Sequence, residues 1–210
     1  VTFNNGMLSG YTVNGTSMLA APLQLNAFRL PIDNERGRAG NYDRMGLRNL
    51  KLTTTQLETT LSKDKQTATV VMTNQYKSEG ESSFVMRQVI DVLADGVLVI
   101  NATIDPQPKN RELPRIGLRT EMPAGFENMC WLGRGPHDSY VDRKESAHVG
   151  LYHSRVSDEW TNYVLPQEQG NKEEVRWMAI TNDAGQGLMV VAPERIAASV
   201  GHWRPEDNYV

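Results

Sequence analysis

A two-residue alternation of polar and apolar side chains constrains this chain more than any other feature. Thr67, Thr69 and Thr73 alternate with apolar residues at positions 68, 70 and 72. Successive side chains of a strand point to opposite faces, so this pattern predicts a strand with one polar and one apolar face. Helical spacing is rare: the stretch 142–152 has charges at helical intervals, but Gly150 and Pro136 make a helix there marginal.

Turn signals between the alternating runs predict hairpins. The β-branched runs 84–93 and 97–104 are joined through Asp95-Gly96, where Gly96 can adopt the positive φ of a tight turn. Two further hairpins are expected, one from 175–180 to 188–191 and one from 10–13 to 18–21 around Asn14-Gly15. With strands at intervals of roughly ten residues, the fold class is predicted to be all-β, an antiparallel sandwich.

Charge and cysteine content exclude several classes of function. The formal net charge is −3, so no basic face is expected for nucleic acid or an anionic membrane. Apolar runs fall far short of the roughly 20 residues that span a bilayer. Cys130, the single cysteine, lies in an apolar run and is expected to be a buried, unreactive thiol. A soluble protein is expected, cytoplasmic or periplasmic if bacterial, and the start without Met suits an excised segment.

Two loop-rich regions, 31–46 and 133–171, carry most of the candidate functional residues, because an all-β scaffold usually holds function in its loops. In the first, Arg29, Asp33 and Asn34 could present donors and acceptors to sugar hydroxyls. The alternative is a loop anchor in which Arg29 pairs with Asp33 or with a backbone carbonyl.

The second region begins with Trp131-Leu132-Gly133-Arg134-Gly135-Pro136-His137-Asp138-Ser139-Tyr140, followed by Asp142-Arg143. It continues through Tyr163-Val164-Leu165-Pro166-Gln167-Glu168-Gln169-Gly170-Asn171 to Arg176-Trp177. These runs closely resemble the C-terminal, small-chain β-sandwich module of glycoside hydrolase family 2 β-galactosidases. The loop 28–37 is similar to that family's Arg-Ala-Pro-Thr-Asp-Asn-Asp-Arg-Gly run, and the resemblance covers essentially the whole chain.

The resemblance implies a β-supersandwich of the galactose mutarotase-like type, with residues 1–210 forming a single module. The family's later Gly-Asp-Asp-Ser-Trp segment is absent, which implies a fragment lacking the last C-terminal strands. Such a module is expected to be non-catalytic, to pack on the catalytic barrel of an enzyme that hydrolyses terminal β-D-galactosides, and to border its active-site mouth. The expected partners are that barrel and a galactoside or other carbohydrate, and a homo-oligomer is compatible with the resemblance.

Most of the candidate residues are expected to order the loops through charge-assisted hydrogen bonds, with direct sugar contact the lesser role. The candidates are Arg29, Asp33, Asn34, Arg134, His137, Asp142, Arg143, Trp160, Tyr163, Gln167 and Glu168. No catalytic residue, cofactor or metal is expected. Glu173 and Glu174 are adjacent in an apparent strand and would point to opposite faces.

Two other functions remain open from the residues. All four Trp lie in the last eighty residues, as expected for a lectin-like module whose aromatic rings stack on pyranoses. Core burial is the alternative for Trp131 and Trp177. An aldose epimerase would need a base and an acid, for which His137, His148, His153 and Glu168 are candidates.

Overall fold

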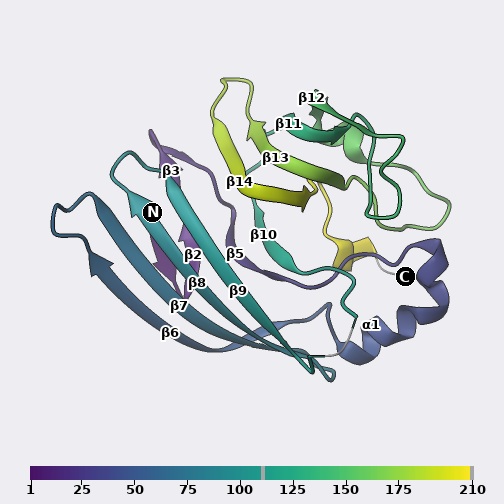
Figure 1. Cartoon of the computed structure of the whole chain (residues 1–210), viewed down its shortest axis with the longest axis horizontal. Coiled ribbons are helices and arrows are strands. Elements are labelled where there is room, and N and C mark those ends of the chain that lie inside the picture. The colour runs from purple at the N-terminus through teal and green to yellow at the C-terminus, as the bar shows by residue number, and fades with distance from the viewer. Residues whose placement is uncertain (110–111, 209–210) are drawn as a thin grey trace. The chain divides into compact units, whose positions relative to one another are not determined.

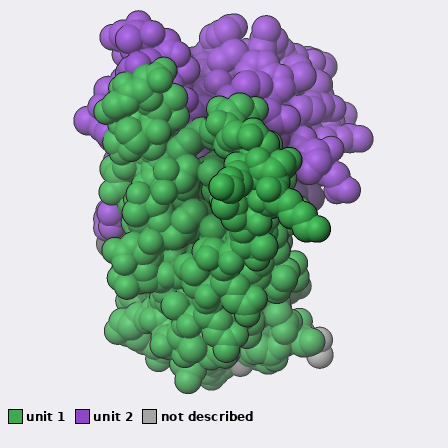
Figure 2. All heavy atoms as spheres, turned by 90° about the vertical axis from the view of Figure 1, so that its left-hand side faces the viewer, with its two compact units in different colours: residues 1–28, 34–122 green, residues 29–33, 123–210 purple. Residues whose placement is uncertain are grey.

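The computed structural model describes residues 1–109 and 112–208 and is built mainly from antiparallel strands, which confirms the predicted all-β class (Figure 1). The chain divides into two compact units, coloured separately in Figure 2. Unit 1 comprises Val1–Phe28 and Asn34–Met122, and unit 2 comprises Arg29–Asp33 and Pro123–Val210. Unit 2 is therefore discontinuous in sequence.

Unit 1 contains a four-stranded antiparallel sheet in the order β6-β7-β8-β9. Its strands are β6 (Lys51–Leu61), β7 (Thr67–Lys77), β8 (Ser83–Leu93) and β9 (Leu98–Gln107). The alternation seen in the sequence becomes its two faces: Val70 and Met72 of β7 and Met86 and Ile90 of β8 are buried. The β8–β9 hairpin forms where predicted, and Gly96 in its turn has φ +93°.

Shorter ladders complete unit 1. They are β1 (Thr2–Asn4) with β2 (Met7–Gly10), β3 (Thr12–Val13) with β4 (Thr16–Ser17), and β5 (Ala21–Asn26) with β10 (Gly117–Glu121). The predicted turn at Asn14-Gly15 joins β3 to β4. β3 is shorter than the expected strand 10–13, and the expected partner strand 18–21 was wrong, because β4 ends at Ser17.

A short helix in unit 1 corrects the prediction of an irregular loop over 31–46. The 3-10 turn η1 (Asp33–Arg38) leads into α1 (Ala39–Met45). Tyr42 and Met45, three residues apart, are both buried, and Gly46 ends the helix with φ +66°. The Gly46 amide donates to the Tyr42 carbonyl at 3.0 Å, so a buried face and a glycine C-cap define this helix.

Unit 2 contains the second four-stranded antiparallel sheet, in the order β12-β11-β13-β14. Its strands are β11 (Asn128–Gly135), β12 (His148–Arg155), β13 (Lys172–Thr181) and β14 (Gly187–Ala198). The predicted hairpin between β13 and β14 is confirmed. The marginal helix over 142–152 is not formed, and residues 148–152 of this stretch belong to β12. The 3-10 turns η2 (Val156–Glu159) and η3 (Pro205–Asn208) complete the unit.

Candidate functional site

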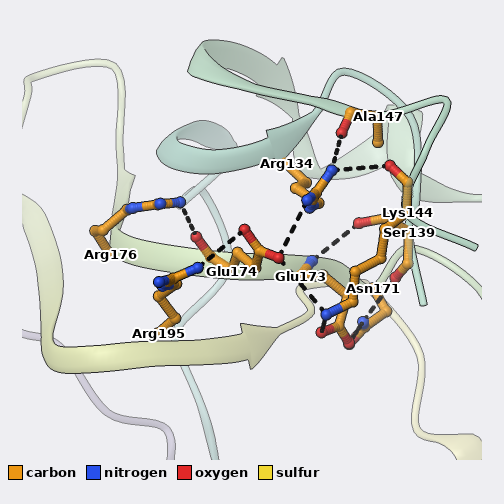
Figure 3. Close-up of polar contacts among 9 residues, drawn as sticks. All are labelled: Arg134, Ser139, Lys144, Ala147, Asn171, Glu173, Glu174, Arg176 and Arg195. Atoms are coloured by element: carbon orange, nitrogen blue, oxygen red, sulfur yellow. Dashed lines mark hydrogen bonds and ion pairs between the residues drawn. The ribbon is translucent and has the colours of Figure 1, made fainter. Parts of the chain in front are cut away.

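Arg134 on β11 lies at the centre of a polar cluster in unit 2 (Figure 3). Its Nη1 donates to the carbonyls of Lys144 at 3.0 Å and Ala147 at 2.9 Å, and its Nη2 lies 3.2 Å from Glu174 Oε1. Gly135 follows Arg134 directly, and a Cβ added at this glycine would lie 2.7 Å from the Tyr152 ring. This glycine thus lets the strand carrying Arg134 approach the Tyr152 ring closely.

Glu174 accepts ion pairs from three different parts of unit 2. Besides Arg134, Lys144 Nζ lies 3.6 Å from Oε1 and Arg195 Nη1 lies 3.6 Å from Oε2. The backbone has φ +53° at this residue, and the register between β13 and β14 shifts here. The hydrogen bond from Arg134 lowers the pKa of Glu174, so this carboxylate is unsuited to act as a general acid.

The bulge at Glu174 overturns the expectation that Glu173 and Glu174 point to opposite faces. Lys144 Nζ is 3.6 Å from Glu173 Oε2 and 3.6 Å from Glu174 Oε1, so both carboxylates reach one ammonium group. An extra residue in a bulged strand interrupts the alternation of side-chain directions, which is the physical reason for the difference.

Ser139 and Asn171, both buried, join the loop after β11 to the start of β13. The Ser139 amide donates to the Asn171 carbonyl at 2.7 Å, and Asn171 Nδ2 donates to the Ser139 carbonyl at 2.8 Å. Ser139 Oγ accepts from the Glu173 amide at 3.0 Å. These bonds fix the position of Glu173 relative to the Arg134 strand.

A buried ion pair lies in the same unit. Lys172 Nζ is 2.7 Å from Glu159 Oε2, and the two side chains are 2% and 6% exposed. The ammonium group also donates to the Pro136 carbonyl at 3.2 Å and lies 5.0 Å from the ring centroid of Trp131. Trp131 is fully buried, as expected for a core residue, and Trp177 is partly exposed.

The segment Arg29–Asp33 is held by the loop before β13. Glu168 Oε2 accepts from the Leu30 amide and Gln167 Oε1 from the Asp33 amide, both at 3.2 Å. Arg29 Nη1 donates to the Leu30 carbonyl at 3.0 Å, which matches the loop-anchor alternative. Glu168 is buried, and its carboxylate stabilises the backbone of this segment through the hydrogen bond from Leu30.

The remaining candidate residues take no part in the contacts described so far. His137 Nε2 is 3.0 Å from Ser146 Oγ, and Arg143 pairs with Asp138 and lies over the Tyr140 ring. The Tyr163 amide donates to the Thr161 carbonyl at 2.9 Å. Asn34 and Asp142 are exposed.

Trp160 is the most exposed of the four tryptophans, with 40% of its surface accessible. Its ring meets that of Trp203 edge to face, with centroids 4.8 Å apart. This contact holds an aromatic surface at the start of the loop 160–171.

Burial changes the pKa of two further titratable groups, Cys130 and Tyr140. Burial raises the pKa of Cys130 even though His153 Nε2 is 3.9 Å from its sulfur, which disfavours a thiolate. The thiol is partly exposed, so the expectation of a buried cysteine was wrong. Burial, then the charge of Asp138, raises the pKa of Tyr140. Among the residues that the structure describes, no group of three or more His, Cys, Asp or Glu could hold a metal ion.

No helix within residues 1–109 and 112–208 is long and apolar enough to span a membrane. Sequence reasoning did not single out Lys144, Glu159, Lys172 or Arg195, which form ion pairs in these contacts. The motif Gly-Arg-Gly-Pro marked the right loop, but it carried no signal for these partners, because strand pairing and the bulge in β13 bring them together.

Comparison with known proteins covers nearly the whole chain. The family model for the β-galactosidase small chain matches residues 1–209. A β-galactosidase of Priestia megaterium is 30% identical over 185 residues, which is 88% of this chain and 18% of the relative. A β-galactosidase of Vibrio cholerae is 28% identical over 187 residues, 83% of this chain and 18% of the relative. The chain therefore spans less than a fifth of the length of these relatives.

Proposed function

Since this chain belongs to the β-galactosidase small-chain family, we propose that it is a non-catalytic module of a larger β-galactosidase that hydrolyses terminal β-D-galactosides. It packs on the catalytic barrel, and its loops border the active-site mouth. The family match over residues 1–209, combined with coverage of only 18% of the Priestia megaterium relative, is the observation that carries this proposal.

The state of the carboxylates in unit 2 supports a non-catalytic role. Retaining glycosidases need a nucleophile and a general acid whose pKa is raised. Glu174 instead has a lowered pKa and faces three cations, Glu159 is paired with Lys172, and Glu168 accepts a backbone hydrogen bond. Each of these groups stabilises a loop or a strand.

The test combines turnover and binding on the purified 210-residue chain. We expect no hydrolysis of an aryl β-galactoside, and calorimetry with galactose or lactose should show millimolar affinity at most. A β-galactosidase holoenzyme serves as the positive control. Turnover that survives further purification would contradict the non-catalytic assignment.

A lectin-like role is the second candidate, and Trp160 is the observation that favours it. The partly exposed indole of Trp160, positioned by its contact with Trp203, can stack on the apolar face of a pyranose. Tight galactose binding without turnover, abolished by Trp160→Ala and retained in Trp177→Phe, would favour this function over the dependent module.

A further inference from the structure

The pairing of β13 with β14 breaks around Arg176. Val175 pairs with Ile196 and Trp177 with Val191, so Arg176 alone lies opposite the four residues 192–195. Pro193 in that stretch has no amide to donate to a ladder. Irregularities of this kind redirect side chains and occur often beside binding sites.

An open groove of about 500 Å³ lies at this break, lined by Arg176, Ala192, Pro193, Glu194 and Arg195. Its volume falls within the range of small-molecule sites, roughly 300–1,000 Å³. Figure 3 shows Arg176 and Arg195 extending side by side toward Glu174 from β13 and β14. The groove is therefore bordered by two guanidinium groups that extend from neighbouring strands.

The two guanidinium groups retain hydrogen-bonding capacity. Arg176 Nη1 donates to the Glu174 carbonyl at 2.6 Å, and Arg195 Nη1 lies 3.6 Å from Glu174 Oε2. A guanidinium group carries five N–H donors, and the other donors of these two side chains have no partner in the part of the chain that the structure describes. These donors are available to a ligand in the groove.

The charges around the groove favour an anion with a single charge. Of the residues that line the groove, Arg176 and Arg195 are cationic and Glu194 is anionic. One positive charge is left over, and a carboxylate matches it better than a doubly charged phosphate. The planar guanidinium group also suits the two oxygens of a carboxylate.

We propose that this groove binds a small monocarboxylate, with a hexuronic acid as the sugar form that fits it best. Arg176 and Arg195 bind the carboxylate, Glu194 accepts a ring hydroxyl, and Ala192 with Pro193 contacts the apolar face of the ring. This site is independent of the proposed β-galactosidase role, because its ligand is acidic and its residues lie on β13 and β14.

Calorimetry on the 210-residue chain with galacturonate, acetate and galactose tests the proposal. We expect galacturonate to bind about tenfold or more tightly than galactose, since a charge-assisted hydrogen bond contributes at least that factor. Added salt should weaken this binding. Acetate binding as tightly as galacturonate would support carboxylate recognition without a role for the ring. Equal affinity for galactose and galacturonate, or no binding of either acid, would overturn the site.

Matched arginine variants identify the groove as the place of binding. Arg195→Gln and Arg176→Gln should each weaken galacturonate binding about tenfold or more. Arg87→Gln, which removes an exposed strand arginine of unit 1, should leave the affinity unchanged. Thermal melting checks that each variant is folded. If Arg176→Gln unfolds the chain, Arg195→Gln provides the test, because Arg195 is largely exposed and its replacement should leave the fold intact. Unchanged affinity in Arg195→Gln would overturn the proposal.

Discussion

At the scale of single residues, burial decides what an ion pair contributes. Lys172–Glu159 and Lys51–Glu79 have similar N–O distances, 2.7 and 2.6 Å, but the first pair is almost fully buried and the second is 70% and 59% exposed. Water screens the exposed pair, whereas the buried charges depend on each other for compensation. The two pairs therefore form a natural comparison within one chain.

Lys172→Met should destabilise the chain by about 3–5 kcal/mol, because it leaves the Glu159 carboxylate buried without its ammonium partner. Urea unfolding at pH 7 measures this change. The control Lys51→Met should cost less than about 1 kcal/mol. Equal losses in the free energy of unfolding for the two variants would show that the buried pair stabilises the chain no more than the exposed one.

Gln88 on β8 presents the opposite case, a buried polar group without compensation. It is 1% exposed, and neither Oε1 nor Nε2 has a hydrogen-bond partner in the described part of the chain. Gln88→Met should therefore stabilise the chain by about 1–3 kcal/mol in urea unfolding. Gln75→Met, at an exposed position of β7, serves as control and should be near neutral. A destabilised Gln88→Met would indicate that the amide is compensated by ordered water.

At the scale of elements, the bulge at the start of β13 gathers the charges of unit 2. An undistorted strand would direct Glu173 and Glu174 to opposite faces, whereas here both reach Lys144. The positive φ of Glu174 is unusual for a residue with a side chain, and its three ion pairs hold it. β11 is thereby connected to β13 and β14.

The pH dependence of Glu174→Gln should reveal this role. The pKa of Glu174 in the folded chain lies below its ordinary value near 4.5, so its contribution is present above that pH and is lost as pH falls through the folded pKa. The variant should melt at a lower temperature than the parent at pH 7, and the gap should shrink below pH 4.5. A gap that is constant with pH would contradict the assignment.

Arg134→Ala tests the same connection from β11. The guanidinium group satisfies two loop carbonyls and Glu174, so its loss should destabilise the chain by about 3 kcal/mol. The effect on galactose affinity should be smaller than the effect on stability. A melting curve unchanged by this substitution would count against the structural role.

At the scale of the whole molecule, unit 2 is assembled from two separated parts of the chain. Arg29–Asp33 contributes the Leu30 and Asp33 amides that bind Glu168 and Gln167. A fragment of residues 123–210 lacks these donors. It should melt at a lower temperature and with less cooperativity than the full chain, as followed by circular dichroism. Melting of the fragment at the temperature of the full chain would show that the short segment is dispensable.

Much of the fold was predictable because its causes are local. Alternation in β7 and β8, the turn at Gly96 and the β13–β14 hairpin depend on neighbouring residues only. Helix α1 was missed because it is short and its signal is only two buried residues and a C-terminal glycine. The motif around Arg134 and the loop anchor at Arg29 marked the right segments without identifying their partners.

The sequence by itself determined the all-β class, the main hairpins and the family, since local patterns and ordered motifs carry that information. Only the tertiary structure decided which charges meet. Lys172 and Glu159 lie 13 positions apart, and Arg134 and Glu174 lie 40 apart. Such pairs depend on strand register, on a bulge and on burial, which arise from packing distant segments together and leave no periodic trace along the chain.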